Sequence, residues 1–315
     1  MVLLLIAVSI LSFVLVSISP IDPLQANVGE AALAGMSEAQ IEKLREYWGV
    51  DTPPFERYMN WAGDVLRGDM GTSLLYRRPV MEVVFEKFSN SVIVLLFAWV
   101  FSGVLGFALG VLAGVNRGRF IDKAINTVTL VIASTPSFWL ALVFLMFFSV
   151  YLGILPVGLS VPIGQLASEV TFGDKLLHAI LPALTLSVTG IANITLHTRE
   201  KMIDVMESDY VLFAKARGES TLSIVKNHGI RNIILPAMTL QFASVSEIFG
   251  GSVLVEEVFS YPGLGQAAVN AGLGADVPLL LGITLIMAGI VFTGNLIANV
   301  LYGVVDPRIR RGGER

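Results

Sequence analysis

Cysteine is absent from this 315-residue chain. Disulfides, thiolate metal sites and cysteine nucleophiles are therefore excluded. Charged residues are also scarce, because they make up 15% of the chain against about 25% in an average soluble domain. Hydrophobic residues reach 54%, and the mean hydropathy is +0.74. This balance argues against a water-soluble globule and predicts an integral membrane protein.

Histidine is rare, and the sequence has no nucleotide-binding motif. The three histidines, His178, His197 and His228, fall at different predicted depths and none belongs to an H-E-x-x-H motif, which argues against a zinc protease. No G-x-x-x-x-G-K-[ST] loop occurs, so the chain cannot bind ATP through a P-loop. We therefore expect no catalytic site, metal site or cofactor in this chain, and any nucleotide chemistry must belong to a partner.

Long apolar runs are what the sequence has in abundance. About twenty apolar residues cross the hydrocarbon core of a bilayer, and six stretches qualify. They are residues 1–19, 90–115, 125–153, 178–197, 236–255 and 278–304. The first is expected to be a retained span, because it has no basic n-region and no A-x-A cleavage pattern. Pro136 is expected to kink the third, which we count once, or to mark an interfacial segment that leads into it. The prediction is an all-α membrane protein with six transmembrane helices.

Lysine and arginine are unevenly distributed between the loops. Three segments carry the basic excess, whereas 154–177 contains only Lys175 and 256–277 contains none. The basic residues are Arg117, Arg119 and Lys123, six between Arg199 and Arg231, and Arg308, Arg310, Arg311 and Arg315. By the positive-inside rule, both termini, including the tail 305–315, are predicted to be cytoplasmic. Residues 20–89 then lie outside.

The external segment 20–89 carries helix signals of its own. Ser37 and Gln40 can form a capping box, and Ile41, Leu44, Tyr47 and Trp48 recur at helical spacing until Gly49. A second helix is predicted from Thr52 to Gly68, with Pro53 in its first turn. Its expected buried stripe is Phe55, Tyr58, Ala62 and Val65. We predict a helical cap packed on the membrane domain; the alternative is a segment that contacts substrate directly.

The cytoplasmic loop 198–235 has the pattern of a helix, a break and a second helix. Tyr210, Phe213, Ala214 and Arg217 share one helical face, and Gly218 can end that helix in a left-handed conformation. Ser220 can cap a second helix that ends near Pro236, at the head of the fifth span. Such a loop suits docking into a groove of another protein. The alternative is an ordinary solvated loop.

Asp209-Tyr-Val-x-x-Ala214-x-Ala216-Arg-Gly218, followed by His228-Gly-x-Arg231-Asn232 and Leu235-Pro236, resembles a known signature. It is similar to the coupling loop of permease subunits in the dipeptide, oligopeptide and nickel branch of ATP-binding cassette importers. Four further segments fit this family in order. They are Arg67-Gly-Asp-Met-Gly-Thr-Ser73, Phe138-Trp-Leu, Glu257-Val-Phe-Ser-Tyr-Pro-Gly-Leu-Gly265 and Val305-Asp-Pro-Arg-Ile-Arg310. The N-terminus departs from the pattern, because it lacks the usual basic lead-in.

The resemblance implies a type I importer architecture in the cytoplasmic (inner) membrane, with an external cap between the first two of six spans. The permease core would be 90–304, working by alternating access. The implied ATPase-coupling residues are Asp209, Tyr210, Val211, Ala214, Ala216, Arg217 and Gly218. The implied partners are a second homologous permease, two cytoplasmic ATPase subunits that bind ATP and Mg, an external solute-binding protein and membrane lipid. Nucleic acid is not expected.

Glu247 lies well inside the fifth apolar run. A carboxylate at that depth is costly, so it is expected to face a water-filled path or a partner group rather than lipid. We predict that it lines the translocation pathway; the alternative is a structural polar contact. Gly250 and Gly251 beside it are expected to serve close helix packing.

Peptides are the first expectation for the cargo, and nickel or a metal chelate is the alternative within the same family. A self-sufficient secondary transporter is the more distant alternative. It would show inverted repeats, paired broken helices or a chain of intramembrane ionisable residues. Only Glu247 stands out in this respect, and the loop 198–235 would have no explanation.

Overall fold

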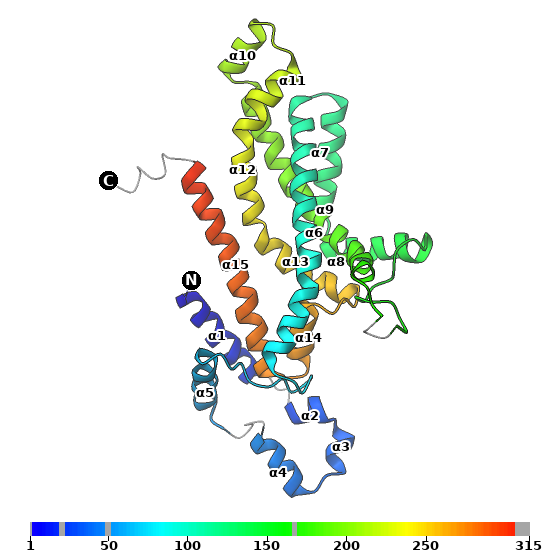
Figure 1. Ribbon diagram of the computed structural model, residues 1–315, viewed down its shortest axis with the longest axis vertical. Helices are drawn as coiled ribbons and strands as arrows, with labels where there is room; N and C mark the ends of the chain where they lie inside the picture. Colours follow the sequence, from blue (N-terminus) through cyan, green and yellow to red (C-terminus); the bar gives the residue numbers. More distant parts are fainter. Residues whose placement is uncertain (1, 19–22, 48–51, 166–168, 306–315) are drawn as a thin grey trace, which may run out of the picture. The chain divides into compact units, whose positions relative to one another are not determined.

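The computed structural model describes residues 2–18, 23–47, 52–165 and 169–305 (Figure 1). Within these ranges the chain is built from helices, with one isolated β-bridge between Thr72 and Pro79. The chain forms two compact units. Unit 1 consists of Met1–Ser91 with Pro262–Ile290, and unit 2 of Val92–Tyr261 with Val291–Arg315.

The helices of unit 1 are α1 (Val2–Ser17), α2 (Pro23–Val28), α3 (Glu30–Ala34), α4 (Glu38–Tyr47), α5 (Pro54–Leu66) and α14 (Leu264–Leu273). Those of unit 2 are α7 (Phe120–Ala133), α8 (Ser137–Phe144), the π-helical η1 (Leu145–Tyr151), α9 (Phe172–Met206), α10 (Asp209–Ala216), α11 (Thr221–Ile224), the π-helical η2 (Val225–Gly229), α12 (Ile230–Ala243) and α13 (Val245–Val258). Two long helices, α6 (Val80–Val115) and α15 (Val277–Val305), contribute to both units.

In the described residues, three of the six predicted runs correspond to helices with the length and composition of a membrane span, or up to five if each of two bent helix pairs is counted as one span. Three are continuous, Val80–Val115, Phe172–Met206 and Val277–Leu301, and two are bent pairs. Helix α1 has 16 residues, about 24 Å at the α-helical rise, which is less than the roughly 30 Å of the hydrocarbon core. The sixth span therefore stays a prediction. The predicted boundaries differ too, because α6 already begins at Val80, inside the expected cap 20–89, and α9 extends beyond 178–197 at both ends.

The third predicted run, 125–153, is broken at Pro136 as expected. Helix α7 ends at Ala133 and α8 begins at Ser137, with a bend of 105° between the two apolar segments. Proline has no N–H with which to continue the helix. The hydroxyls of Ser134 and Thr135 donate to the carbonyls of Leu130 and Val131 over 2.9 and 2.7 Å. These bonds give two of the last carbonyls of α7 a partner at the break.

The fifth predicted run, 236–255, is arranged differently from the prediction. Pro236 was expected at the head of a span, but it lies inside α12, which continues from α11 through the π-helical η2. The helix breaks instead at Ser244, where α13 leaves at an angle of 43°.

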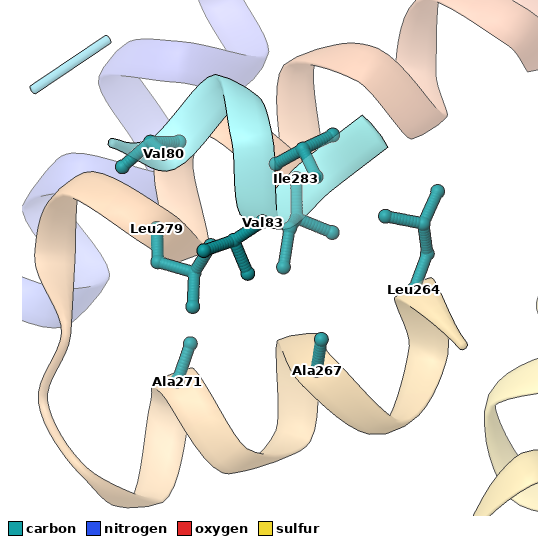
Figure 2. Packing of buried hydrophobic residues seen from close by; sticks show 8 residues of the cluster. Val80, Val83, Leu264, Ala267, Ala271, Leu279 and Ile283 are labelled. Carbon is teal, nitrogen blue, oxygen red and sulfur yellow. The ribbon is translucent and has the colours of Figure 1, made fainter. Parts of the chain in front are cut away.

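The core of unit 1 joins three helices that are far apart in the sequence. Figure 2 shows side chains of α6, α14 and α15 pointing toward one another. The buried members are Val80, Val83, Val84, Leu264, Ala267, Ala271, Leu279 and Ile283. The small alanines of α14 allow the branched side chains of α6 and α15 to approach that helix closely, as in other densely packed interiors.

The expected cap is only partly as predicted. The Ser37 amide donates to Gln40 Oε1 over 2.9 Å at the start of α4, but α5 begins at Pro54 rather than Thr52. The stripe predicted on α5 is wrong at Phe55, which is 77% exposed. Tyr58 instead packs on α1, where its ring centre lies 5.2 Å from that of Phe13. Trp48, Gly49 and residues 306–315 lie outside the described residues.

Three glycines of α6 form a close contact with α9 in unit 2. Gly106, Gly110 and Gly114 recur every four residues and face α9. A Cβ added to Gly110 would lie 2.5 Å from Thr198 Cβ and 2.8 Å from the carbonyl oxygen of Thr195. Small residues at this spacing let two helix backbones approach, a common arrangement in membranes. The G-x-x-x-G-x-x-x-G pattern is visible in the sequence, and our sequence analysis missed it.

Candidate functional site

The loop predicted as helix, break and helix forms a hairpin of α10 and α11, here called the 208–224 hairpin. It lies at the ends of the long helices α9 and α12 within unit 2 (Figure 1). Gly218 has a φ of +81°, the left-handed conformation predicted for it, which a residue with a Cβ adopts only at a cost. The Ser223 amide donates to Ser220 Oγ over 3.3 Å, so the predicted cap is present.

The hairpin has its own small core. Val211 and Ala214 are buried against Ile224, and Val205 and Met206 at the end of α9 pack on this cluster. Tyr210 and Phe213 are exposed to 45% and 65%. The face predicted from spacing is therefore divided, because Ala214 points inward whereas its neighbours point outward. The small size of Ala214 serves packing within the chain.

The outward face of α10 is a mixture of aromatic and charged side chains. Asp209, Ala216 and Arg217 are exposed along with Tyr210 and Phe213. The guanidinium carbon of Arg217 lies 5.9 Å from the ring centre of Phe213, a distance suited to a cation–π contact. An exposed apolar surface rimmed by charge is typical of a protein-binding face.

Two ion pairs connect the base of the hairpin to the loop between α6 and α7. Arg117 pairs with Glu207, the residue that ends α9. Arg199 pairs with Asp122 in the first turn of α7. The end of α9 that leads into the hairpin is thereby held by the loop after α6 and by the first turn of α7. Neither Asp122 nor Glu207 was assigned a role from the sequence. For Asp122 a signal was visible, because it is an acidic residue in the first turn of a helix.

Glu247 lies in the first turn of α13 and faces α9. Asn193 Nδ2 donates to Glu247 Oε2 over 3.1 Å, and the glutamate is exposed on the surface of this chain. A Cβ at Gly250 would meet no atom within 4 Å, so the predicted packing role of Gly250 is wrong; at Gly251 it would make an ordinary contact of 3.4 Å with Leu186. The face of α13 around Glu247 and Gly250 is therefore open.

The segment Arg67–Ser73 forms a loop that docks on the start of α15. Asp276, which is fully buried, accepts hydrogen bonds from Ser73 Oγ over 2.6 Å, the Leu75 amide over 3.0 Å and the Leu279 amide over 3.2 Å. A carboxylate at a helix N-terminus is stabilised by the free amides there. Asp276 was not singled out in the sequence.

The segment Glu257–Gly265 anchors the end of α13. The Leu159 amide donates to the carbonyl of Phe259 over 3.0 Å, and Phe259 and Tyr261 are buried. A Cβ at Gly158 would lie 2.0 Å from Phe259 O, so only glycine fits. His178 Nδ1 lies 2.7 Å from the carbonyl oxygen of Gly158. Burial raises the pKa of the Tyr261 phenol, with a smaller contribution from Glu256.

Across the described residues, a helical architecture with several membrane-length apolar helices defines the class of multi-pass membrane proteins. The family described as "Binding-protein-dependent transport system inner membrane component" matches residues 106–311. The chain belongs to this family, as its motifs predicted, and is a permease subunit of an ATP-binding cassette importer.

Relatives are similar over nearly the full chain. The oligopeptide transport system permease protein AppB of Bacillus subtilis is 34% identical, covering 97% of this chain and 95% of AppB. The di/tripeptide transport system permease protein DppB of Pseudomonas aeruginosa is 33% identical, with 96% and 94% covered. The dipeptide transport system permease protein DppB of Escherichia coli K12 is 31% identical, with 97% and 94% covered.

The fold is also similar to that of a solved transporter. A chain of the inward-facing MetNI methionine ABC transporter matches 72% of this chain and 97% of its own length, with a TM-score of 0.57 and 16% sequence identity. This likeness concerns the fold alone.

Proposed function

We propose that this chain is one of two permease subunits that together enclose a path for di- and oligopeptides across the cytoplasmic membrane. The cargo assignment is supported by the relatives, which are named as oligopeptide, di/tripeptide and dipeptide permeases. In this proposal the chain has six spans, both termini are cytoplasmic, and residues 20–89 are external. An external solute-binding protein delivers the cargo and two cytoplasmic ATPase subunits bind ATP and Mg.

The 208–224 hairpin is proposed to dock on the ATPase. The observation that carries this assignment is the exposed aromatic face of α10, on a hairpin whose core packs on the end of α9, which in turn pairs with the loop after α6. Tyr210, Phe213 and Arg217 would contact the ATPase, with Asp209 and Ala216 on the same accessible surface. Val211, Ala214 and Gly218 would act by fixing the shape of the hairpin. A rigid attachment transmits a displacement of the hairpin to α9 and α12.

Glu247 and Asn193 are proposed to line the path. Their hydrogen bond joins α9 to α13, and the open space beside Gly250 leaves this face accessible. Polar groups on apolar helices generally face a bundle interior or a water-filled cavity. Alternating access would then follow from movement of the two permease subunits against each other when the ATPases close.

The test is ATP hydrolysis by the assembled importer in lipid nanodiscs, with a binding protein loaded with peptide or with nickel. Tyr210→Ala combined with Phe213→Ala is expected to lose ATPase subunits on purification and to lose stimulation by the loaded binding protein. Phe172→Ala, which removes a 69% exposed aromatic ring at the opposite end of α9 from the hairpin, is the matched control. Wild-type stimulation in the double variant contradicts the docking assignment, and stimulation by the nickel-loaded protein alone contradicts the peptide assignment.

A further inference from the structure

A cavity of about 690 Å³ lies within unit 1, between α1, α4, α5, the loop after α5 and the start of α15. Its wall is mainly apolar and includes Phe13, Met36, Trp61 and Leu281. Two cationic side chains, Arg57 and Arg77, also line it. Neither the proposed peptide path nor the 208–224 hairpin uses this cavity.

Arg57 is a half-buried cation that lacks an acidic partner among the described residues. Its Nη2 donates to Ser17 Oγ over 3.1 Å, and its guanidinium carbon lies 5.3 Å from the ring centre of Phe13. Its Nε is buried and finds no hydrogen-bond acceptor in the described part of the chain. Burial lowers the pKa of the guanidinium. A buried donor of this kind is costly unless an acceptor is supplied.

Trp61 provides a second donor of the same kind. Its Nε1 is also buried without a hydrogen-bond partner in the described residues. Trp61 follows Arg57 by four positions on α5, so the two side chains lie on the same face of the helix. Both nitrogens are enclosed by the protein, so an acceptor in the cavity reaches them once the two side chains turn toward it. Two unsatisfied N–H groups and a positive charge beside an apolar cavity then suit an anionic group with several acceptor oxygens.

We propose that the cavity binds an amphipathic anion, a molecule with one acidic group on an apolar body, and that Arg57 Nε and Trp61 Nε1 donate to the acidic group. Two molecules share this chemistry: an anionic phospholipid and a peptide with a free C-terminal carboxylate. Arg57 contacts Ser17 at the end of α1, whose exposed surface is apolar at Leu3, Leu11 and Leu15. Such a surface can pack against an acyl chain, and Phe13 of the same helix lines the cavity.

The experiment uses the full chain purified in neutral detergent. Native mass spectrometry measures retention of phosphatidylglycerol against phosphatidylcholine, and a tripeptide is compared with its C-terminal amide. Arg57→Gln is expected to weaken binding of the anion about tenfold, because it removes a charge-assisted hydrogen bond. Arg57→Lys restores part of this loss, and Trp61→Phe produces a smaller loss. Arg67→Gln is the matched control, because Arg67 follows the same helix, pairs with Asp64 and has an 81% exposed side chain.

The comparison of the two lipids and the comparison of the tripeptide with its amide together identify which kind of anion binds. Preferential binding of phosphatidylglycerol, or of the tripeptide over its amide, supports the proposal if it is lost in Arg57→Gln. Equal binding of charged and neutral compounds, or equal behaviour of Arg57→Gln and Arg67→Gln, overturns it. The peptide arm rests on the proposed function, but binding is measured on this chain without ATPases, so failure here leaves the transport test unaffected. Trp61→Phe keeps the proposal testable if Arg57→Gln does not fold.

Discussion

Arg199 donates two hydrogen bonds to Asp122, from Nε to Oδ1 over 2.6 Å and from Nη2 to Oδ2 over 2.9 Å. The Gly118 amide donates to Oδ2 as well, over 2.8 Å. The side chain of Asp122 is only 3% exposed and that of Arg199 is 23% exposed. This pair connects the start of α7 to the part of α9 that leads into the 208–224 hairpin. A movement of the hairpin would therefore also move α7.

Arg199→Gln is expected to destabilise the chain by about 3 kcal/mol, because it leaves the Asp122 carboxylate buried without its counter-ion. Lys201→Gln on the same helix is the control. Its ion pair with Asp204 has side chains that are 57% and 66% exposed, so its loss is expected to cost less than about 0.5 kcal/mol. Thermal unfolding in nanodiscs compares the two. Equal unfolding midpoints for Arg199→Gln and Lys201→Gln would show that the Arg199–Asp122 pair does not stabilise the fold.

Gly110→Ala is expected to destabilise unit 2 by about 1–3 kcal/mol, because the added methyl group meets Thr198 Cβ at 2.5 Å and a backbone carbonyl oxygen at 2.8 Å. The carbonyl group of Thr195 belongs to the backbone of α9, so it cannot move aside as a flexible side chain can. Gly289→Ala in α15 is the control, since a Cβ there meets nothing within 4 Å. Thermal unfolding and yield of folded protein are the measurements. Similar stability of both variants contradicts close α6–α9 packing.

Asp276→Asn is expected to destabilise unit 1 by about 2 kcal/mol, because the amide is neutral and cannot accept all three hydrogen bonds that the carboxylate accepts. The loop 67–79 should then become more accessible to proteases. Asp69→Asn removes an exposed carboxylate that accepts from the Gly71 amide and is the control. If both variants are cleaved at the wild-type rate, Asp276 does not hold this loop.

Val211→Ala is expected to loosen the 208–224 hairpin, because Val211 is fully buried against Ala214 and Ile224. Loss of two methyl groups from a small core costs about 1–2 kcal/mol. Hydrogen exchange of residues 208–224 should therefore accelerate, and transport per ATP hydrolysed should fall. Leu212→Ala, at a position that is 66% exposed, should leave exchange unchanged. Unchanged exchange in Val211→Ala argues against a hairpin core.

Glu247→Gln is expected to lower peptide transport several-fold while leaving the thermal stability unchanged, because glutamine keeps the acceptor for Asn193 but loses the charge. Uptake into proteoliposomes and the ratio of transport to ATP hydrolysis are the measurements. Glu200→Gln, an exposed glutamate on α9, is the control. Unchanged transport and coupling in Glu247→Gln would remove the charge of this residue from the proposed path.

Local signals predicted much of the backbone. Pro136 breaks the third apolar run, Gly218 adopts the left-handed conformation, and Ser220 caps α11, because these residues act on their own backbone. Motifs in order along the chain also identified the family. The helical spacing of residues 210–217 and the break at Gly218 also predicted the 208–224 hairpin, which forms most of the candidate coupling surface.

The sequence by itself therefore determined the helical membrane class, the family and the positions of the main breaks, since these depend on composition and on near neighbours. The tertiary structure decided which residues meet. Asp122 pairs with a residue 77 positions away and Ser73 with one 203 positions away. It also turned Ala214 inward and left Phe55 exposed. Helical spacing defines a stripe of side chains, but only packing against another element determines whether that stripe is buried.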